Sequence, residues 1–323
     1  MMASYPGGEQ GLARSGSGMV WSIVLAGGEG TRLRPLIQRI HADGRPKQFA
    51  VLVGSRSLLR QTLDRSAMLV PPERTIAVAT RSHAAFFTGA AWGENPPHVL
   101  VQPSDRGTAA GVLLPVHRIA RIDPGATVLV FPSDHYVGDD EAFMAHAEKM
   151  AAAAARNPAR ILLAGALPDG PETGYGWIEP GAAIERLPVG ELRAIRHFVE
   201  KPSEEMARAL MGRGGLWNTF VMAASVDALI HAGRRTLPLL HERLALIGAR
   251  RGDAEARAIE SAYRGSPTAN FSHSVLAQLP DLLAVSTLPP VDWSDWGTPD
   301  RVVETLRRAR IEPEWLRRLA TTA

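Results

Sequence analysis

The chain has 323 residues, enough to bury a full core as one large α/β domain or as a domain with a smaller appendage. It contains no cysteine, which excludes disulfide bonds and thiolate metal sites. The net charge of +3 is too small to indicate nucleic-acid binding, and no apolar run reaches the roughly 20 residues that cross a bilayer. Residues 1–19 lack the apolar middle of a signal peptide, so we expect a disordered leader and a cytoplasmic protein.

Short apolar runs alternate with amphipathic stretches along the first half of the chain. The pattern predicts strands at 21–28, 75–80, 98–103, 126–135 and 160–168, and helices at 57–70, 108–122 and 140–155. Strands that alternate with helices of this length indicate right-handed βαβ units. The predicted fold class is therefore α/β, with a Rossmann-like, mixed but mostly parallel sheet flanked by helices.

The second half has a different character. Residues 175–181 and 192–202 are predicted to be extended segments that cross the sheet, 203–214 a helix opened by Ser203, and 282–300 strand and loop. Residues of about 225–264 have an entirely helical pattern, which we interpret as an insertion. We expect one domain over 20–300 and a C-terminal helical cap over 301–323. The basic, amphipathic pattern of this cap fits a helix packed on the domain, with a membrane or partner contact as the alternative.

A glycine-rich loop follows the first predicted strand, in the sequence VLAGGEGTRLRPL over residues 24–36. Glycine lets backbone N–H groups approach phosphate oxygens, because no side chain keeps the anion away. The loop lacks the Lys-Ser/Thr ending of a P-loop, and Leu33 stands where the dinucleotide-binding pattern has its third glycine. Its two arginines, Arg32 and Arg34, suit a chain of several phosphates. The loop predicts a polyphosphate site; the alternative is a surface turn with solvated arginines.

Other charged residues are predicted to lie near this loop. Lys47 follows a proline that stiffens its turn, and Asp134 ends the most apolar strand. Ligands of parallel sheets bind beyond the carboxyl ends of the strands, so the loop and Asp134 are expected in one crevice. Carboxylates there suit Mg²⁺, with Asp295 as a second ligand and a share for Asp292 left open. The alternative for each is a turn or capping residue. We interpret His135 as structural and not as a base.

Together these motifs resemble the sugar-1-phosphate nucleotidyltransferases, most of all the mannose-1-phosphate guanylyltransferase family. Over about residues 21–300 they occur in the family's order and approximate spacing: the loop at 25–36, RPKQF at 45–49, QPSDRGTAAG at 102–111, FPSDH at 131–135, GYGWIEPG at 174–181, FVEKP at 198–202, LWNT at 216–219 and DWSDWG at 292–297. The resemblance implies Mg²⁺-dependent transfer of a nucleotidyl group from an NTP, with GTP expected, to a sugar-1-phosphate, with mannose-1-phosphate expected. Pyrophosphate is the second product.

The resemblance also implies roles for individual residues. Arg32 would bind the triphosphate, Lys47 would contact the reacting phosphates, and Asp134 and Asp295 would ligate Mg²⁺. The nucleotide would be held by Leu25, Gly27, Gly28, Gly30, Thr31, Gln102, Arg106, Gly107 and Thr108. The sugar-phosphate pocket would be lined by Gly176, Glu200, Lys201 and Asn218, with Lys201 on the phosphate and Glu200 on sugar hydroxyls. The expected partners are the two substrates, with neither nucleic acid nor membrane; a homodimer is left open.

Several positions depart from the family pattern. Ile37 stands where the family has threonine, and Gly107, near the base, stands where it has asparagine. Phe220, in the sugar pocket, stands where the family has glycine, and Asn270 stands where it has aspartate. These changes leave the predicted metal ligands and lysines in place, so they affect substrate identity more than reaction type. Two alternatives follow: the same reaction with another NTP or sugar-1-phosphate, and a non-catalytic regulatory relative that binds a nucleotide sugar. A dinucleotide-dependent oxidoreductase is disfavoured by the missing third glycine.

Overall fold

A computed structural model describes residues 18–188, 190–248 and 250–321 of the chain. The predicted leader falls almost entirely outside these residues. Its last residue, Met19, lies against the domain, because its backbone N–H donates to Asp123 Oδ2 at 2.9 Å. Trp21 Nε1 donates to the same oxygen at 3.2 Å. The first strand is therefore anchored from its beginning.

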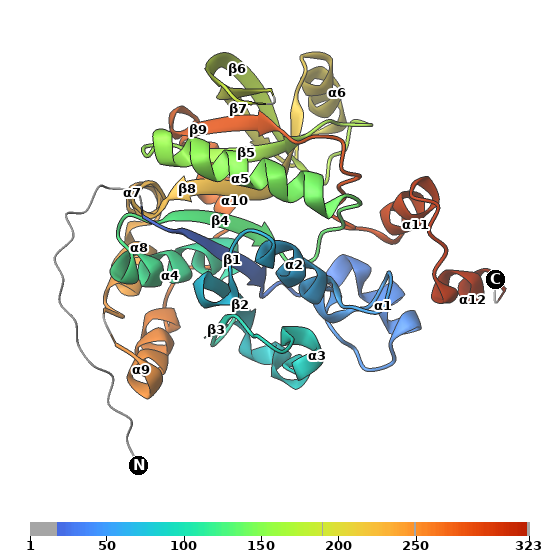
Figure 1. The fold of residues 1–323 in the computed structure, drawn as a ribbon, viewed down its shortest axis with the longest axis horizontal. Coiled ribbons are helices and arrows are strands. Elements are labelled where there is room, and N and C mark those ends of the chain that lie inside the picture. Colours follow the sequence, from blue (N-terminus) through green and yellow to red (C-terminus); the bar gives the residue numbers. More distant parts are fainter. Residues whose placement is uncertain (1–17, 189, 249, 322–323) are drawn as a thin grey trace.

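Strands and helices alternate through the first half, as the hydrophobic pattern predicts (Figure 1). The strands of this half are β1 (Val20–Ala26), β2 (Thr75–Thr80), β3 (His98–Gln102), β4 (Thr127–Pro132) and β5 (Ile161–Ala166). Its helices are α1 (Arg34–Ile40), α2 (Leu58–Ala67), α3 (Gly89–Trp92), α4 (Gly107–Ile122) and α5 (Asp140–Arg156). The pattern did not predict α1 and α3, which are short.

The second half adds four strands and the remaining helices. The strands are β6 (Gly176–Arg186), β7 (Glu191–Glu200), β8 (Leu216–Ser225) and β9 (Leu283–Thr287). The helices are α6 (Glu204–Gly212), α7 (Val226–Thr236), α8 (Pro238–Ala245), α9 (Gly252–Tyr263), α10 (Phe271–Ser274), α11 (Pro299–Arg308) and α12 (Glu314–Thr321). The predicted extended segments are β6 and β7, which form an antiparallel hairpin at the edge of the sheet.

Within the described residues the strands form one sheet in the order β3-β2-β1-β4-β8-β5-β9-β7-β6. β7 and β8 run against the direction of the other strands. The mixed, mostly parallel α/β class is thus confirmed. Because β8 is antiparallel between β4 and β5, its first residues emerge where those two strands end. This brings a segment from far along the chain to the carboxyl edge of the sheet.

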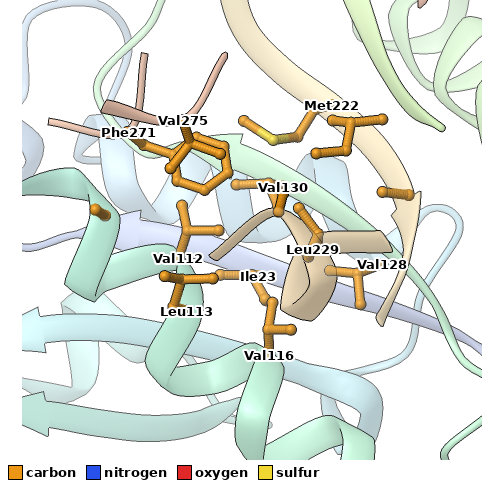
Figure 2. Close-up of a cluster of buried hydrophobic side chains, with 14 of the residues drawn as sticks. Ile23, Val112, Leu113, Val116, Val128, Val130, Met222, Leu229, Phe271 and Val275 are labelled. Atoms are coloured by element: carbon orange, nitrogen blue, oxygen red, sulfur yellow. The ribbon is translucent and has the colours of Figure 1, made fainter. Parts of the chain in front are cut away.

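Alternating side chains of the central strands point to opposite faces of the sheet. Val128 and Val130 face a core closed by α4, α7 and α10, where Ile23, Met222 and Leu229 also pack (Figure 2). Leu129 and Phe131 face the opposite core, which α5 covers. A strand covered on both faces is a continuous apolar run, which is why the sequence of β4 shows no alternation of apolar and polar residues.

The C-terminal helices pack against α1. Trp315 of α12 and Val302 and Leu306 of α11 share a cluster with Leu36 and Ile37 of α1, and the three helices lie together in Figure 1. Trp315 Nε1 also donates to the carbonyl oxygen of Leu52 at 2.8 Å. The segment after the last strand is therefore bound to the same side of the domain as the glycine-rich loop.

In the described ranges, none of the helices combines the length and the apolar character needed to cross a membrane.

Candidate active site

A cavity of about 300 Å³ opens at the carboxyl ends of β1 and β4. Ten of the residues predicted from the sequence line it: Leu25, Gly28, Arg32, Thr108, Asp134, Gly176, Glu200, Lys201, Asn218 and Asp295. They come from segments spread over most of the chain. The fold thus brings residues predicted for the nucleotide, the metal and the sugar phosphate to one space.

The other predicted residues lie behind or beside this cavity. Gly30 and Lys47 border a smaller neighbouring cavity of about 120 Å³. Gly27 packs on Gln102, so closely that a Cβ on Gly27 would lie 2.8 Å from Gln102 Nε2. The remaining three, Thr31, Arg106 and Gly107, lie at the ends of helical segments.

The glycine-rich loop is held from behind by side chains of its neighbours. Gln48 Nε2 donates to the carbonyl oxygens of Ala26, at 2.8 Å, and Gly28, at 3.0 Å. The hydroxyl of Thr80, at the end of β2, donates to the Gly27 carbonyl oxygen at 3.1 Å. Gly30 has φ 58°, in the left-handed region that favours glycine. With their carbonyl groups bound on one side, the loop residues are held in a fixed position at the mouth of the cavity.

A buried ammonium group joins the two predicted metal ligands. The side chain of Lys47 is 4% exposed, and its Nζ donates to Asp134 Oδ2 at 3.0 Å. The same Nζ donates to the backbone carbonyl oxygen of Asp295. Lys47 is far from both aspartates in the sequence, yet it holds their two segments together.

The carboxylate of Asp295 has a dense set of partners. Its Oδ1 accepts hydrogen bonds from the Tyr175 hydroxyl at 2.8 Å, from Arg301 Nη1 at 2.9 Å and from the Gly297 backbone N–H at 2.9 Å. Arg32 Nη2 lies 3.8 Å from Oδ2. Oδ1 is thus bound by the protein, while Oδ2 faces the side from which Arg32 approaches.

Both carboxylates are ionised in this environment. Burial opposes their charge, but the ammonium of Lys47 holds the pKa of Asp134 below its usual value. For Asp295 burial also opposes ionisation, and His135, Arg301 and Lys47 together lower the pKa. Ionised carboxylates can bind a divalent cation. In the described part of the chain no group of three or more histidine, cysteine or acidic side chains is arranged so that it could hold a metal ion by itself.

His135 lies beside the carboxylates without a hydrogen bond to them. Its Nε2 is 3.8 Å from Asp134 Oδ1, and its ring meets the Trp293 ring edge-on at 5.4 Å between centroids. Burial lowers the pKa of His135, so the imidazole is neutral at pH 7. Its Nδ1 is buried and has no partner among the described residues.

The predicted base-binding side rests on long-range hydrogen bonds. The Tyr263 hydroxyl donates to Gln102 Oε1 at 2.9 Å, and the Phe271 backbone N–H donates to the Thr108 hydroxyl at 2.8 Å. Gly107 has φ 77°, and a Cβ there would lie 2.3 Å from the Ala269 carbonyl oxygen. The replacement of the family's asparagine by Gly107 therefore allows the segment around Ala269 to pack directly on the start of α4.

The predicted sugar side is the part of the cavity lining formed at the start of β6, the end of β7 and the start of β8. A Cβ on Gly176 would lie 2.8 Å from Glu200 Oε2 and 3.3 Å from the Asn218 Cβ, so this glycine makes room for both side chains. Burial raises the pKa of Glu200, an effect that Lys201 opposes. Lys201 itself has φ 49° and is exposed at its side chain. Its backbone N–H donates to the Tyr175 carbonyl oxygen at 3.1 Å.

Phe220 lines the same wall in a strained conformation. Its φ is 60°, in the region that a bulky residue rarely adopts, which explains why glycine is usual at this position of the family. An irregularity in the pairing of β5 with β8 permits this conformation, and the ring packs edge-on against Phe271 at 6.1 Å. The ring thus joins the sugar side to the segment that supports Thr108.

Tyr175 and Arg301 are site residues that the sequence motifs did not predict. Tyr175 lies within the quoted GYGWIEPG motif, but nothing in the sequence placed its hydroxyl on Asp295. Arg301 lies beyond the last motif, on α11. Its guanidinium stacks 4.1 Å above the Tyr175 ring and also pairs with Glu172. The signal that could have found it is its position six residues after Asp295, at the start of a helix opened by Thr298.

The chain is similar to known proteins over most of its length. The sequence pattern of the family described as nucleotidyl transferase matches residues 21–310. Xanthan biosynthesis protein XanB of Xanthomonas campestris pv. campestris (strain B100) is 32% identical over 288 residues, which cover 86% of this chain and 58% of that protein. Mannose-1-phosphate guanylyltransferase of Sinorhizobium fredii (strain NBRC 101917 / NGR234) is 28% identical over 288 residues, covering 86% and 53%.

A solved structure is also similar to this chain. The crystal structure described as mannose-1-phosphate geranyltransferase from Thermus thermophilus is 32% identical to this chain. Its TM-score is 0.75, and the match covers 91% of this chain and 80% of the other. The chain spans little more than half the length of the two curated relatives.

Proposed function

The chain belongs to the nucleotidyl transferase family, and from this premise we propose that it transfers the nucleotidyl group of an NTP to a sugar-1-phosphate. The proposed substrates are GTP and mannose-1-phosphate. One observation carries the proposal: a single cavity is bordered by the glycine-rich loop, by the carboxylates of Asp134 and Asp295, and by Lys201. This arrangement suits two phosphate-bearing substrates that must meet.

The reaction requires positioning more than proton transfer. An oxygen of the sugar phosphate attacks the α-phosphorus of the NTP, the new O–P bond forms, and the bond to the β-phosphate breaks with its electron pair leaving on pyrophosphate. The attacking oxygen is already an anion, so no general base is needed. A neutral His135 that makes no hydrogen bond to Asp134 fits this chemistry. Arg32 and Lys47 would neutralise charge on the phosphates.

Mg²⁺ is the proposed cofactor. Asp134 and Asp295 would hold it, because both are ionised, both line the cavity, and Mg²⁺ commonly takes one or two carboxylates together with phosphate oxygens. When bound, the ion would stabilise the negative charge that develops on the α-phosphate and the leaving group. Tyr175 and Arg301 would keep the Asp295 carboxylate oriented toward it.

The sugar side supports a phosphate and hydroxyl recognition site. Lys201 supplies a cation at the cavity wall, and Glu200 and Asn218 supply groups that can bind hydroxyls. Phe220 stands beside them as a large ring where the family has glycine, so it is the residue expected to decide which sugar fits.

The proposal is tested by pyrophosphate release with Mg²⁺ across a matrix of four NTPs and a panel of sugar-1-phosphates. We expect strongest release with GTP and mannose-1-phosphate. Strong release with another NTP or sugar-1-phosphate would replace the proposed substrates and assign a selective role to Gly107 or Phe220. The variant Phe220→Gly, which suits a φ of 60°, would check the role of Phe220. No release in any cell, from protein that binds a nucleotide sugar by calorimetry, would favour the regulatory relative.

A further inference from the structure

The helices α8 and α9 border a second cavity, of about 730 Å³, which shares no lining residue with the candidate active site. Figure 1 shows where these two helices lie in the fold. Ligand sites commonly have volumes of about 300–1,000 Å³. One helical face of each helix lines the cavity, at positions spaced by three and four residues: Leu239, Glu242, Arg243 and Leu246 from α8 and its end, and Ala254, Arg257, Ala258 and Ser261 from α9. The cavity is thus built from two aligned helix faces.

The charge of this cavity is positive. Arg243, Arg250 and Arg257 line it, and Glu242 is the one carboxylate among its described lining residues. Arg250 donates to the carbonyl oxygens at the end of α8 and so caps that helix. Arg243 and Arg257 form no ion pair with any residue in the described part of the chain. Two guanidinium groups therefore remain available to an anion.

Arg243 is held in place while one of its donors lacks an acceptor. Its guanidinium lies against Gly265, where a Cβ would be 3.2 Å from Nη1 and where φ is 134°. Its Nε is buried and has no hydrogen-bond partner among the described residues. A buried donor on a cation is costly to leave unpaired, and an anionic oxygen is its best acceptor.

Apolar side chains lie beside the arginines. Leu239 is 47% exposed and Leu246 is 74% exposed, and both line the cavity together with Ala258. Large apolar side chains this exposed, next to unpaired cations, suit a ligand with an anionic group and an apolar or ring-shaped part.

We propose that α8 and α9 form a binding site for a small organic phosphate. Arg243 and Arg257 would bind the phosphate oxygens, since guanidinium groups present paired N–H donors that match them. Leu239 and Leu246 would cover the organic part. The site is separate from the one proposed for the substrates.

The opposite side of α9 connects this site to the predicted base-binding residues. Ala262 lines the cavity, and the next residue, Tyr263, donates its hydroxyl to Gln102 Oε1 at 2.9 Å. Glu255, also on α9, lies 3.7 Å from Arg118 of α4. A ligand that fixes α9 is therefore expected to change the affinity for NTP. This coupling rests on the proposed function, whereas the binding site itself does not.

The binding site is tested with phenyl phosphate, a phosphate monoester that carries a ring and is neither a nucleotide nor a sugar phosphate. Calorimetric titration of the full chain saturated with GTP measures its dissociation constant. We expect binding that weakens about tenfold or more in Arg243→Ala/Arg257→Ala. Arg264→Ala, an exposed arginine just after α9 that does not line the cavity, is the matched control and should bind as the wild type does.

A second variant separates blocking of the cavity from loss of charge. Ser261→Trp adds a large ring on the exposed cavity face of α9 and should abolish binding while both arginines remain. The site is refuted by absent binding in the wild type, by an unchanged dissociation constant in the double arginine variant, or by competition between GTP and phenyl phosphate for one location.

The coupling between the α8–α9 site and NTP binding is tested by measuring the affinity for GTP with and without phenyl phosphate. Phenyl phosphate is expected to shift the dissociation constant for GTP about threefold or more in the wild type, and by less in Tyr263→Phe, which still binds phenyl phosphate. An unshifted GTP affinity with phenyl phosphate bound refutes the coupling. If GTP does not bind at all, the proposed function fails, and the phenyl phosphate titration without GTP still decides the site.

Discussion

Two parts of the active-site lining hold their charges differently: the carboxylate wall, which contains Asp134 and Asp295, and the Lys201 wall. In the carboxylate wall Asp295 is 13% exposed, and Lys47 behind it is 4% exposed; each is bound to protein groups. In the Lys201 wall, Lys201 is exposed, and its ammonium makes no hydrogen bond or ion pair within the described residues. The first wall is organised in advance, as electrostatic catalysis requires. The second leaves a positive charge available to an incoming phosphate.

Tyr175 connects the two walls. Its hydroxyl donates to Asp295, and its carbonyl oxygen accepts the backbone N–H of Lys201. Its ring lies under the Arg301 guanidinium and beside the Trp217 and Trp293 rings. Because the charges of the carboxylate wall are already bound to protein groups and the charge of Lys201 is not, we expect substitutions in the carboxylate wall to lower turnover. Substitutions in the Lys201 wall should mainly weaken sugar-phosphate binding.

The largest effect is expected from Asp134→Asn. The variant removes a carboxylate that faces the cavity and pairs with Lys47, so Mg²⁺-dependent pyrophosphate release should fall on the order of 10²–10³-fold. Circular dichroism should show a retained fold. Asp292, whose share in the metal site the sequence left open, does not line the cavity; its carboxylate is 53% exposed and pairs with Arg308. Asp292→Asn is therefore the matched control and should stay near the wild type. Turnover of Asp134→Asn within about threefold of the wild type would show that the metal assignment is wrong.

A smaller loss is expected from Arg301→Ala. Arg301 acts through Asp295 and Tyr175 as a positioning residue, and loss of such support commonly lowers activity about 10–100-fold. The loss should appear in kcat, with KM for the sugar phosphate little changed, and Arg301→Lys should restore part of it. Arg308→Ala, on the same helix but paired with the exposed Asp169, should leave kcat unchanged. A purely structural role would instead lower the melting temperature of Arg301→Ala and leave kcat of the folded protein intact.

Lys201→Ala tests the Lys201 wall. It should raise KM for the sugar-1-phosphate about tenfold, because a cation that binds phosphate is lost, and should leave KM for the NTP within about twofold. Steady-state kinetics with each substrate varied in turn measures both constants. Lys201→Arg keeps the charge and should retain most of the affinity. A change confined to the NTP constant would mean that the two pockets have been exchanged.

The smallest effect concerns stability and pH. The pKa of Asp295 is lowered in the folded chain, where burial opposes its charge but His135, Arg301 and Lys47 favour it. Its ionised form therefore stabilises the fold above its usual pKa of 3.8, and this stabilisation is lost as pH falls through the lowered value. Urea unfolding at pH 7 should give a free energy about 1–3 kcal/mol higher for the wild type than for Asp295→Asn.

This difference between wild type and Asp295→Asn should shrink as the pH is lowered below about 3.8. A difference that stays constant from neutral to strongly acid pH would contradict the assignment of charge to Asp295. Asp292→Asn, at an exposed carboxylate, serves as the control and should show little difference at either pH.

Much of the fold followed from local pattern. The apolar runs of β1, β2 and β4 and the amphipathic periods of α2, α4 and α5 predicted these elements to within a few residues, because burial on one or two faces leaves a period in the sequence. The same reasoning placed the glycine-rich loop and Asp134 at the carboxyl ends of parallel strands, and so in one crevice. The pairing of β1 with β4 in the structure makes these two ends neighbours.

Pairings between distant segments depended on the tertiary structure. The antiparallel insertion of β8 between β4 and β5 brings Asn218 to the cavity. The hydrophobic period of a single segment does not indicate which strands become its neighbours. The strained φ of Phe220 also depends on this pairing, because the bulge that permits it exists only once β8 lies against β5.

The elements, the glycine-rich loop and the residue types that phosphate chemistry needs could be predicted from the sequence alone. Which of those residues contact one another depends on the tertiary structure. Lys47 reaches Asp134 across 87 positions, and Tyr175 reaches Asp295 across 120. Such contacts form when the apolar faces of segments far apart in the chain are buried against each other. The sequence of one segment predicts which of its faces is buried, but not the segment against which that face packs.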